Sequence, residues 1–153
     1  MLYDLENTAL FQDLSHEDLN AIAKFCRREV LADGDVIIHE NERTGHDIFI
    51  LCKGAVEVVS NQTNMLSGEA VLSPETKELF GEISWLTKSR RTASVRAKGP
   101  VEVIRVEGAR LDAYMTQHPQ AGFAIMRRIA TLLSQRLSET DTLLKQILWN
   151  TGI

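Results

Sequence analysis

One short run in the middle of the chain carries the groups that could bind a sugar phosphate. Gly81 and Glu82 begin this run, and Arg91 and Thr92 follow after a short, mostly apolar stretch. A guanidinium offers a fork of donors that fits two phosphate oxygens, and the threonine hydroxyl adds a donor beside it. An ionised carboxylate only accepts hydrogen bonds, so Glu82 could take them from a ribose hydroxyl. The alternative interpretation is a solvated basic pair, Arg90 and Arg91, with Glu82 as its salt-bridge partner.

Backbone groups of the same run could complete such a site. Gly81 lets the backbone approach a ligand closely and adopt an unusual φ. Ile83, Ser84 and Trp85 can begin a single helical turn, and the first amides of a helix have no partner within it. Such amides point outward and can bind an anion. Residues 80–95 therefore predict a site for a sugar phosphate.

The surrounding pattern predicts the fold that would position this run. Residues 28–107 contain short β-runs separated by recurring turns, including Lys53-Gly54, which is typical of a closed, mainly β domain. Eight short strands fit a jelly-roll (double-stranded β-helix) barrel, and the continuous apolar run 48–52 is expected to be buried on both faces. A helix over residues 10–27, capped by Ser15, precedes the barrel. Helices over 108–150 follow, so residues 1–153 are expected to form one domain.

The last predicted helix begins at Pro119, runs to about Asn150 and carries two apolar stripes. The first has the alternating spacing of a coiled-coil seam and consists of Met126, Ala130, Leu133, Leu137, Thr140, Leu144 and Ile147. The adjacent stripe consists of Ile125, Ile129, Leu132 and Leu143. One stripe could pack on the barrel and the other on a second copy, which predicts a homodimer through residues 119–150. The alternative is one broad face against the body.

Composition excludes several classes of protein. The net charge of −4 lacks the basic balance typical of nucleic-acid binders. No apolar run approaches the roughly 20 residues of a membrane span, and the N-terminus does not resemble a signal peptide, so we expect a cytoplasmic protein. The chain ends with the long helix and leaves no residues for a recognition helix, so no direct DNA binding is expected.

A jelly-roll metal enzyme of the cupin type is a weaker alternative. Such an enzyme needs a His-x-His pair, whereas His39 and His46 are not so spaced, and His16 and His118 fall in helical regions. No nucleophile or general base stands in a recognisable motif. We therefore expect no metal, no cofactor and no catalysis.

Residues 80–95 resemble the phosphate-binding cassette of the cyclic nucleotide-binding domain family, as found in the catabolite activator protein and in regulatory subunits of the cyclic-AMP-dependent kinase. That cassette reads roughly Phe-Gly-Glu-Leu-Ala-Leu, a short gap, then Pro-Arg-Ala-Ala-Thr-Val. This chain has Phe80-Gly-Glu-Ile-Ser-Trp85 and Arg90-Arg-Thr-Ala-Ser-Val95. The ranges 10–15, 34–38 and 47–58 also look like the family's first helix and early strands, so the resemblance covers nearly the whole chain.

The resemblance implies a regulatory domain, not an enzyme, that binds cyclic AMP or cyclic GMP. Gly81 and Glu82 would bind the ribose 2′-hydroxyl. The cyclic phosphate would be bound by the amides of Ile83 and Ser84 together with Arg91, Thr92 and Ala93. The Thr92 hydroxyl would bias the site toward cyclic GMP, because it can reach the guanine amino group.

The resemblance also implies contacts from the last helix to the base. Arg136 and Thr140 are candidates for these contacts, and Trp149 could stack on the purine as a lid; each could equally be a seam or surface residue. Ligand binding would close the cassette, move the long helix and so change the surface met by an effector protein that the sequence does not identify. The alternative is a degenerate domain that keeps the fold and serves as a protein-interaction or dimerisation module.

Overall fold

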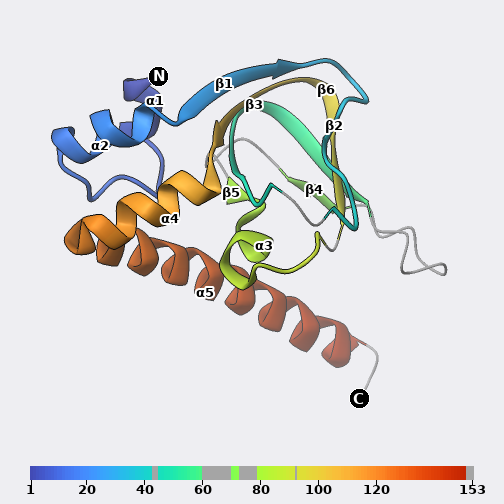
Figure 1. Ribbon diagram of the computed structural model, residues 1–153. Helices are drawn as coiled ribbons and strands as arrows, with labels where there is room; N and C mark the ends of the chain where they lie inside the picture. Colours follow the sequence, from blue (N-terminus) through green and yellow to red (C-terminus); the bar gives the residue numbers. More distant parts are fainter. Residues whose placement is uncertain (43–44, 60–69, 73–78, 92, 151–153) are drawn as a thin grey trace.

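The computed structural model of the chain describes residues 1–42, 45–59, 70–72, 79–91 and 93–150. A curved antiparallel sheet forms one side of the molecule, and helices gather at one end of it (Figure 1). The short helix α3, Glu82–Thr87, lies between the sheet and the long helix α5, Pro119–Asn150. The predicted sugar-phosphate run is therefore placed where the sheet meets the last helix.

Two short helices begin the chain, α1 over Leu2–Glu6 and α2 over His16–Ala23. Ser15 caps α2 as expected, because its hydroxyl oxygen accepts from the Asp18 amide at 3.2 Å. The helix expected over 10–27 is shorter than predicted: turns precede Ser15, and Cys26 already belongs to a strand. Pairing of Cys26–Leu31 with Val101–Val106 satisfies the backbone there in place of a longer helix.

The strands of the described residues are β1 Cys26–Leu31, β2 Val36–Ile38, β3 Ile48–Val59, β4 Ala70–Leu72, β5 Leu79–Phe80 and β6 Ser94–Val106. All described strand pairs are antiparallel and belong to one sheet with the order β1-β6-β3-β4. Two further strands attach to this path, because β2 pairs with β6 and β5 pairs with β3.

The eight-stranded closed jelly-roll is not confirmed, because the described residues form six strands in a sheet without observed closure. The turn expected at Lys53-Gly54 is wrong: β3 continues through it, with shifts of register on either side of Lys53. A bulge of this kind bends a strand without ending it. Gly54 has φ +87°, and a Cβ there would lie 2.3 Å from the Pro100 carbonyl oxygen of β6. The two long strands β3 and β6 thus lie very close together at the position where the sequence pattern predicted a turn.

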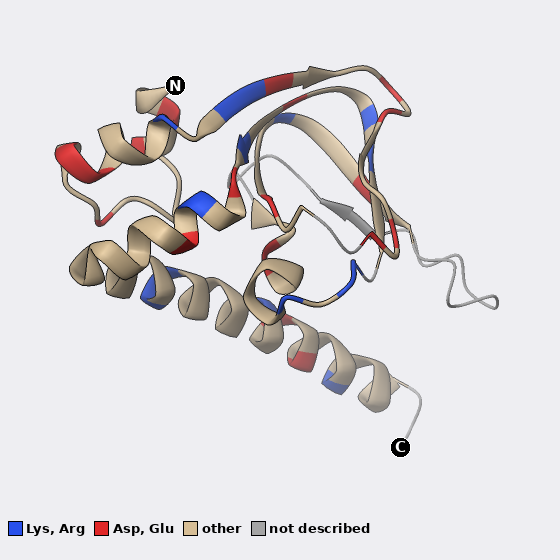
Figure 2. Cartoon of the chain, in the orientation of Figure 1, with Lys and Arg blue, Asp and Glu red and all other residues tan. Residues whose placement is uncertain are grey.

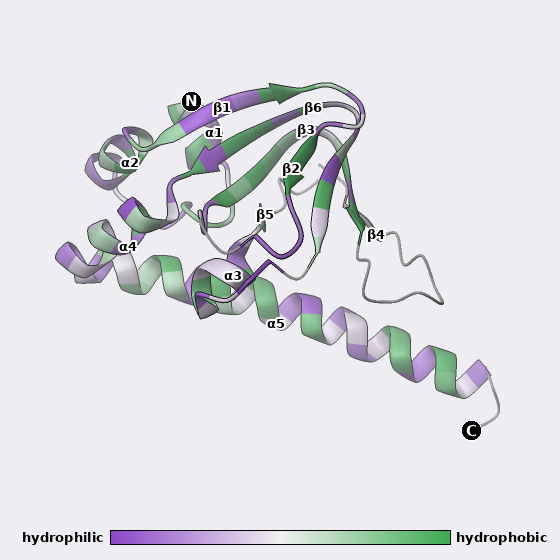
Figure 3. Cartoon of the chain, turned by 45° about the vertical axis from the view of Figure 1, so that its right-hand side comes forward, coloured by the Kyte–Doolittle hydropathy of each residue, from purple (hydrophilic) through white to green (hydrophobic). Residues whose placement is uncertain are grey.

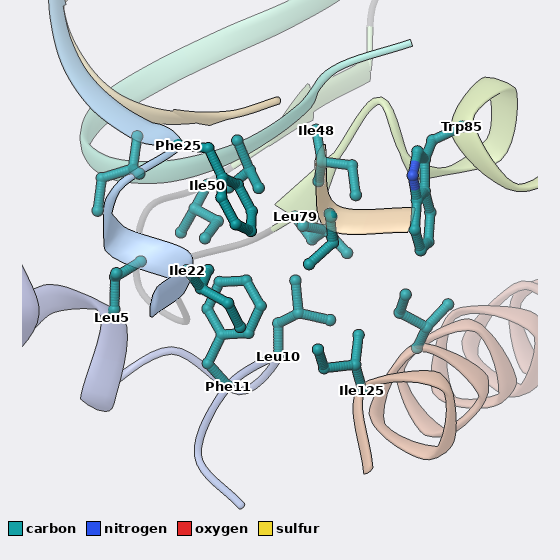
Figure 4. Close-up of a cluster of buried hydrophobic side chains, with 14 of the residues drawn as sticks. Leu5, Leu10, Phe11, Ile22, Phe25, Ile48, Ile50, Leu79, Trp85 and Ile125 are labelled. Atoms are coloured by element: carbon teal, nitrogen blue, oxygen red, sulfur yellow. The ribbon is translucent and has the colours of Figure 1, made fainter. Parts of the chain in front are cut away.

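The core has two parts, one on each face of β3. Ile48 and Ile50 belong to the cluster between sheet and helices, which also contains Trp85 and Ile125 (Figure 4). Phe49 and Leu51 face the other way, into the cluster formed inside the curve of the sheet. Successive side chains of a strand point to opposite faces, so a continuous apolar run is buried on both. The prediction is confirmed for residues 48–51, whereas Cys52 is half-buried.

The C-terminal helices are α4, Gly108–Gln117, and α5, Pro119–Asn150, close to their predicted positions. The two apolar stripes of α5 separate only in part. Ile125 and Ile129 are buried against the body and Met126 is exposed, whereas Leu132 and Leu133, one from each stripe, both pack against the same core. Every residue from 137 to 150 is exposed, because this part of α5 extends past the sheet (Figure 3). One broad buried face therefore does not extend over residues 137–150, and the choice between this interpretation and a dimer seam stays a prediction.

Among the described residues, no helix is both long enough and apolar enough to cross a membrane.

Candidate functional site

A cavity of about 260 Å³ lies where β5, α3, α5 and the segment before β6 meet. Its walls are largely apolar, and Glu82, Arg90, Arg91 and Arg136 bring charge to it. A mostly apolar cavity with a few converging polar groups is the usual form of a ligand site. The predicted site residues that line it are Gly81, Glu82, Ile83, Ser84, Arg91 and Ala93.

Gly81 shapes the wall of this cavity through its backbone. Its φ of +84° lies in the left-handed region, which glycine adopts without strain, and it forms the N-cap of α3. A Cβ at this position would lie 2.9 Å from the Asp47 carbonyl oxygen and 3.0 Å from Nη1 of Arg91. Glycine is therefore required for the close approach of Arg91 to the backbone.

Arg91 is 5% exposed and is held by backbone carbonyl groups. Its Nη1 donates to the Gly81 carbonyl oxygen at 2.8 Å, and its Nη2 donates to those of Gly45 and Asp47 at 2.9 and 2.8 Å. None of the carboxylates in the described ranges forms an ion pair with it. Burial lowers the pKa of Arg91, since the charged form loses hydration that dipoles only partly replace. The carboxylates of Glu42, Asp47 and Glu82 attract this cation without forming an ion pair with it, so the buried charge favours an anionic ligand.

Two polar atoms of the cavity-lining residues are buried and have no hydrogen-bond partner: Nε of Arg91 and Oγ of Ser84. A buried donor without a partner costs about 1–3 kcal/mol, which is why such groups are rare in folded proteins. The interpretation of Arg90 and Arg91 as a solvated pair is wrong for Arg91, although Arg90 is exposed. The segment after α3 is visibly basic (Figure 2).

Glu82 is 3% exposed, and its carboxylate pairs with Arg136 of α5. Arg136 Nη1 lies 2.5 Å from Glu82 Oε1, and Nη2 donates to the carbonyl oxygen of Leu79 in β5. One guanidinium therefore joins the long helix to both the cassette and the sheet. The alternative interpretation required an ion pair between Glu82 and Arg90 or Arg91, and Glu82 forms neither pair.

The other predicted base contacts lie away from the cavity. The Thr140 hydroxyl is exposed and donates to the Arg136 carbonyl oxygen of its own helix at 3.0 Å. Trp149 is 85% exposed near the end of α5, where the helix has passed the body. Thr92, the predicted selectivity residue, lies outside the described residues.

Sequence reasoning missed a second set of residues, which connects the cavity to α4. The indole Nε1 of Trp85 donates to the Gly108 carbonyl oxygen at 3.1 Å, and the Gly108 amide donates to Oδ1 of Asp47 at 3.0 Å. Asp47 Oδ2 accepts from Nε of Arg105 at 2.7 Å. There is no room for a side chain at Gly108, because a Cβ there would lie 2.2 Å from the carbonyl oxygen of His46. No local pattern indicates these contacts, because the partners are far apart in the sequence.

Within the described ranges, no group of three or more histidine, cysteine, aspartate or glutamate side chains is arranged to hold a metal ion. Cys26 and Cys52, the two cysteines of the chain, are not joined by a disulfide.

Comparison with known proteins shows which family and which proteins this chain is similar to. A family model for the cyclic nucleotide-binding domain matches residues 28–118. The chain is 31% identical to a cAMP-dependent protein kinase regulatory subunit of Hypocrea atroviridis over 65% of its own length and 20% of that protein. It is 26% identical to the cyclic AMP receptor protein of Thermus thermophilus, over 90% of this chain and 61% of the receptor protein. The chain thus spans less than two thirds of either relative.

Solved structures agree on the fold. A cyclic nucleotide-binding domain from Methylobacillus flagellatus superposes with a TM-score of 0.80 at 19% identity, covering 95% of this chain and 85% of that one. The catabolite activator protein of Thermus thermophilus superposes with a TM-score of 0.70 at 25% identity, over 92% of this chain and 63% of that one.

Proposed function

Since the chain belongs to the cyclic nucleotide-binding domain family, we propose that its cavity binds cyclic AMP or cyclic GMP as a regulatory ligand and catalyses no reaction. The observation that carries this proposal is Arg91, a buried guanidinium that has carbonyl partners, no ion pair with a described carboxylate and an unpaired Nε. A cyclic phosphate supplies the missing negative charge. The cytoplasm is the compartment in which we expect it to act.

In this proposal the phosphate is bound by Arg91, Thr92 and Ala93 together with the amides of Ile83 and Ser84. Gly81 and the Glu82 carboxylate bind the ribose 2′-hydroxyl. Arg136 already lines the cavity and could contact the base, whereas Thr140 and Trp149 could do so only if α5 moved. A single Thr92 hydroxyl is worth about 1 kcal/mol net, so it would bias the choice of base without deciding it.

Transmission to α4 is the second part of the proposal. Arg91 contacts the carbonyl oxygens of Gly81 and Asp47, and the Asp47 carboxylate binds the first residue of α4. Trp85 holds the same residue from α3, and Lys88 at the end of α3 pairs with Asp112 of α4. A phosphate that binds Arg91 would change the hydrogen bonds of Arg91 to the carbonyl oxygens of Gly81 and Asp47. A ligand with a few kcal/mol of preference for one arrangement then shifts the helices.

The exposed seam of α5 is the surface on which we expect the output. Met126, Leu137 and Leu144 fit the spacing of a two-stranded coiled coil and are exposed. A second copy of this chain presents the same spacing and can pair with it around a two-fold axis. We propose a homodimer through α5 that presents its changed helices to an effector protein. If the cavity binds no nucleotide, this seam still supports the alternative function of a dimerisation module.

Calorimetric titration with cyclic AMP and cyclic GMP tests the proposal. We compare the wild type with Arg91→Lys, which keeps the charge and loses the fork, and with Arg127→Lys as the matched control, since Arg127 is exposed and outside the cavity lining. Arg91→Lys should weaken binding at least about tenfold, because hydrogen bonds to a charged group are lost, whereas Arg127→Lys should change affinity only slightly. Undiminished affinity in a folded Arg91→Lys variant would remove Arg91 from this role.

A further inference from the structure

The Ser84 hydroxyl differs from the other helical hydroxyls near it. Hydroxyls within helices commonly donate to the carbonyl oxygen four residues earlier. Thr87 does so in the same short helix, with its Oγ1 2.8 Å from the Ile83 carbonyl oxygen, and Thr116, Thr131, Thr140 and Thr142 do so elsewhere. Ser84 is 5% exposed, yet its Oγ has no partner. Four residues before it the chain is still in β5, so no helical carbonyl is placed for it.

The second unpaired atom of the cavity is Nε of Arg91, and both residues line the same space. Each atom carries a hydrogen that it could donate, and one of the two groups is cationic. A negatively charged oxygen is the acceptor that could serve both donors. A serine hydroxyl reorients by rotation about a single bond, so it can turn toward such an oxygen when a ligand enters.

We infer that the Ser84 hydroxyl donates a hydrogen bond to a non-bridging oxygen of the cyclic phosphate. Ser84 then binds the ligand through its side chain in addition to its backbone amide. This inference rests on the proposed function, because it requires a cyclic nucleotide in the cavity. It adds a group that the cassette pattern does not contain, since that pattern has alanine where this chain has Ser84.

The inference predicts that Ser84→Ala has opposite effects on stability and on affinity. Without ligand, the substitution removes a buried unpaired hydroxyl and places a better helix former in α3, so the unfolding temperature should stay the same or rise. With ligand, one hydrogen bond to a charged oxygen is lost, so affinity should fall about tenfold. A purely structural role of Ser84 would move both quantities in the same direction.

Titration of the wild type and Ser84→Ala with cyclic AMP and cyclic GMP measures this directly, beside thermal unfolding of the free proteins. Thr87→Ala is the matched control, because its hydroxyl is exposed, paired within the helix and outside the cavity lining. It should leave affinity unchanged within about twofold. The Sp and Rp phosphorothioate analogues each replace one non-bridging oxygen by sulfur, a weaker acceptor. For one of the two analogues, Ser84→Ala should cause a smaller loss than for the oxygen ligand.

The outcomes separate this inference from the proposed function. If the wild type binds neither nucleotide, the proposed function and this inference both fail. If the wild type binds and Ser84→Ala binds equally well, only the role of the hydroxyl is refuted. An affinity loss of the same size for the oxygen ligand and for both phosphorothioates would also refute it, because the hydroxyl would then act through the fold and not through the phosphate.

Discussion

The pair of Glu82 and Arg136 offers the sharpest test of how α5 is held at the cavity. The perturbation is a double-mutant cycle with Glu82→Gln, Arg136→Met and the double variant, measured first without ligand. Arg136→Met alone leaves a buried carboxylate without its cation, whereas Glu82→Gln leaves a guanidinium that still reaches water and the Leu79 carbonyl oxygen. We therefore expect Arg136→Met to be the more destabilising of the two single variants.

The size of the coupling follows from the burial of the two partners. The Glu82 side chain is 4% exposed and that of Arg136 is 38% exposed. Exposed pairs couple by about 0.2–1 kcal/mol, and breaking a fully buried pair costs about 3–5 kcal/mol. A pair with one partner in water should lie between these limits, at about 1–2 kcal/mol. The exposed pair Asp141 and Lys145 of the same helix is the control and should couple by no more than about 0.5 kcal/mol.

Urea unfolding monitored by circular dichroism supplies the four free energies of unfolding. A coupling below about 0.3 kcal/mol would mean that the two substitutions are additive. It would refute the conclusion that this ion pair stabilises the position of α5. Repeating the cycle at saturating cyclic nucleotide adds a second test. If the ribose hydroxyl also binds Glu82, the coupling to Arg136 should decrease when the ligand is present.

Three further predictions address the fold, the dimer and the pH dependence of stability. Gly108→Ala places a Cβ 2.2 Å from the His46 carbonyl oxygen, so it should lower the free energy of unfolding by about 3 kcal/mol or more, at or above the upper end of the usual cost of overpacking. A loss below about 1 kcal/mol in urea unfolding would contradict the close packing of α4. Leu137→Glu on the seam should shift sedimentation from dimer to monomer, whereas Leu143→Glu, also at an exposed leucine but off the seam, should do so much less. Burial raises the pKa of the Cys26 thiol from 9.0 to about 12, so the unfolded chain loses this proton first and stability should fall as the pH rises from about 9 toward 12. Urea midpoints at pH 8 and pH 10 should therefore differ less in Cys26→Ala than in the wild type, and an unchanged difference would exclude this thiol as a cause.

Some of the site could be predicted because it depends on neighbours in the sequence. Gly81, Glu82, Ser84 and Arg91 belong to one continuous run, and a turn and a short helix are enough to bring them to one cavity. The division of α5 into two stripes was predictable for the same reason, because helical periodicity alone separates Ile125 from Met126.

Other features could not be predicted, because they depend on pairs that are distant in the chain. The predicted number of strands was wrong at Lys53-Gly54, where a turn was expected. The structure has a bulge there, because β6 pairs with the residues on both sides of Lys53. Register and bulges depend on which strands meet, and no local signal contains that information. For the same reason Thr140 and Trp149 were candidates for base contacts, although α5 carries them past the cavity.

The sequence by itself determined the chemistry of the site, since an arginine, a carboxylate and a glycine at this spacing can serve a sugar phosphate wherever the run is placed. Only the tertiary structure decided the partners of these groups. Arg91 is buried because the carbonyl oxygens of Gly45 and Asp47 come from a distant segment, and Glu82 meets Arg136 because α5 crosses α3. Burial is set by the whole fold, and burial is what makes this arginine a candidate anion site.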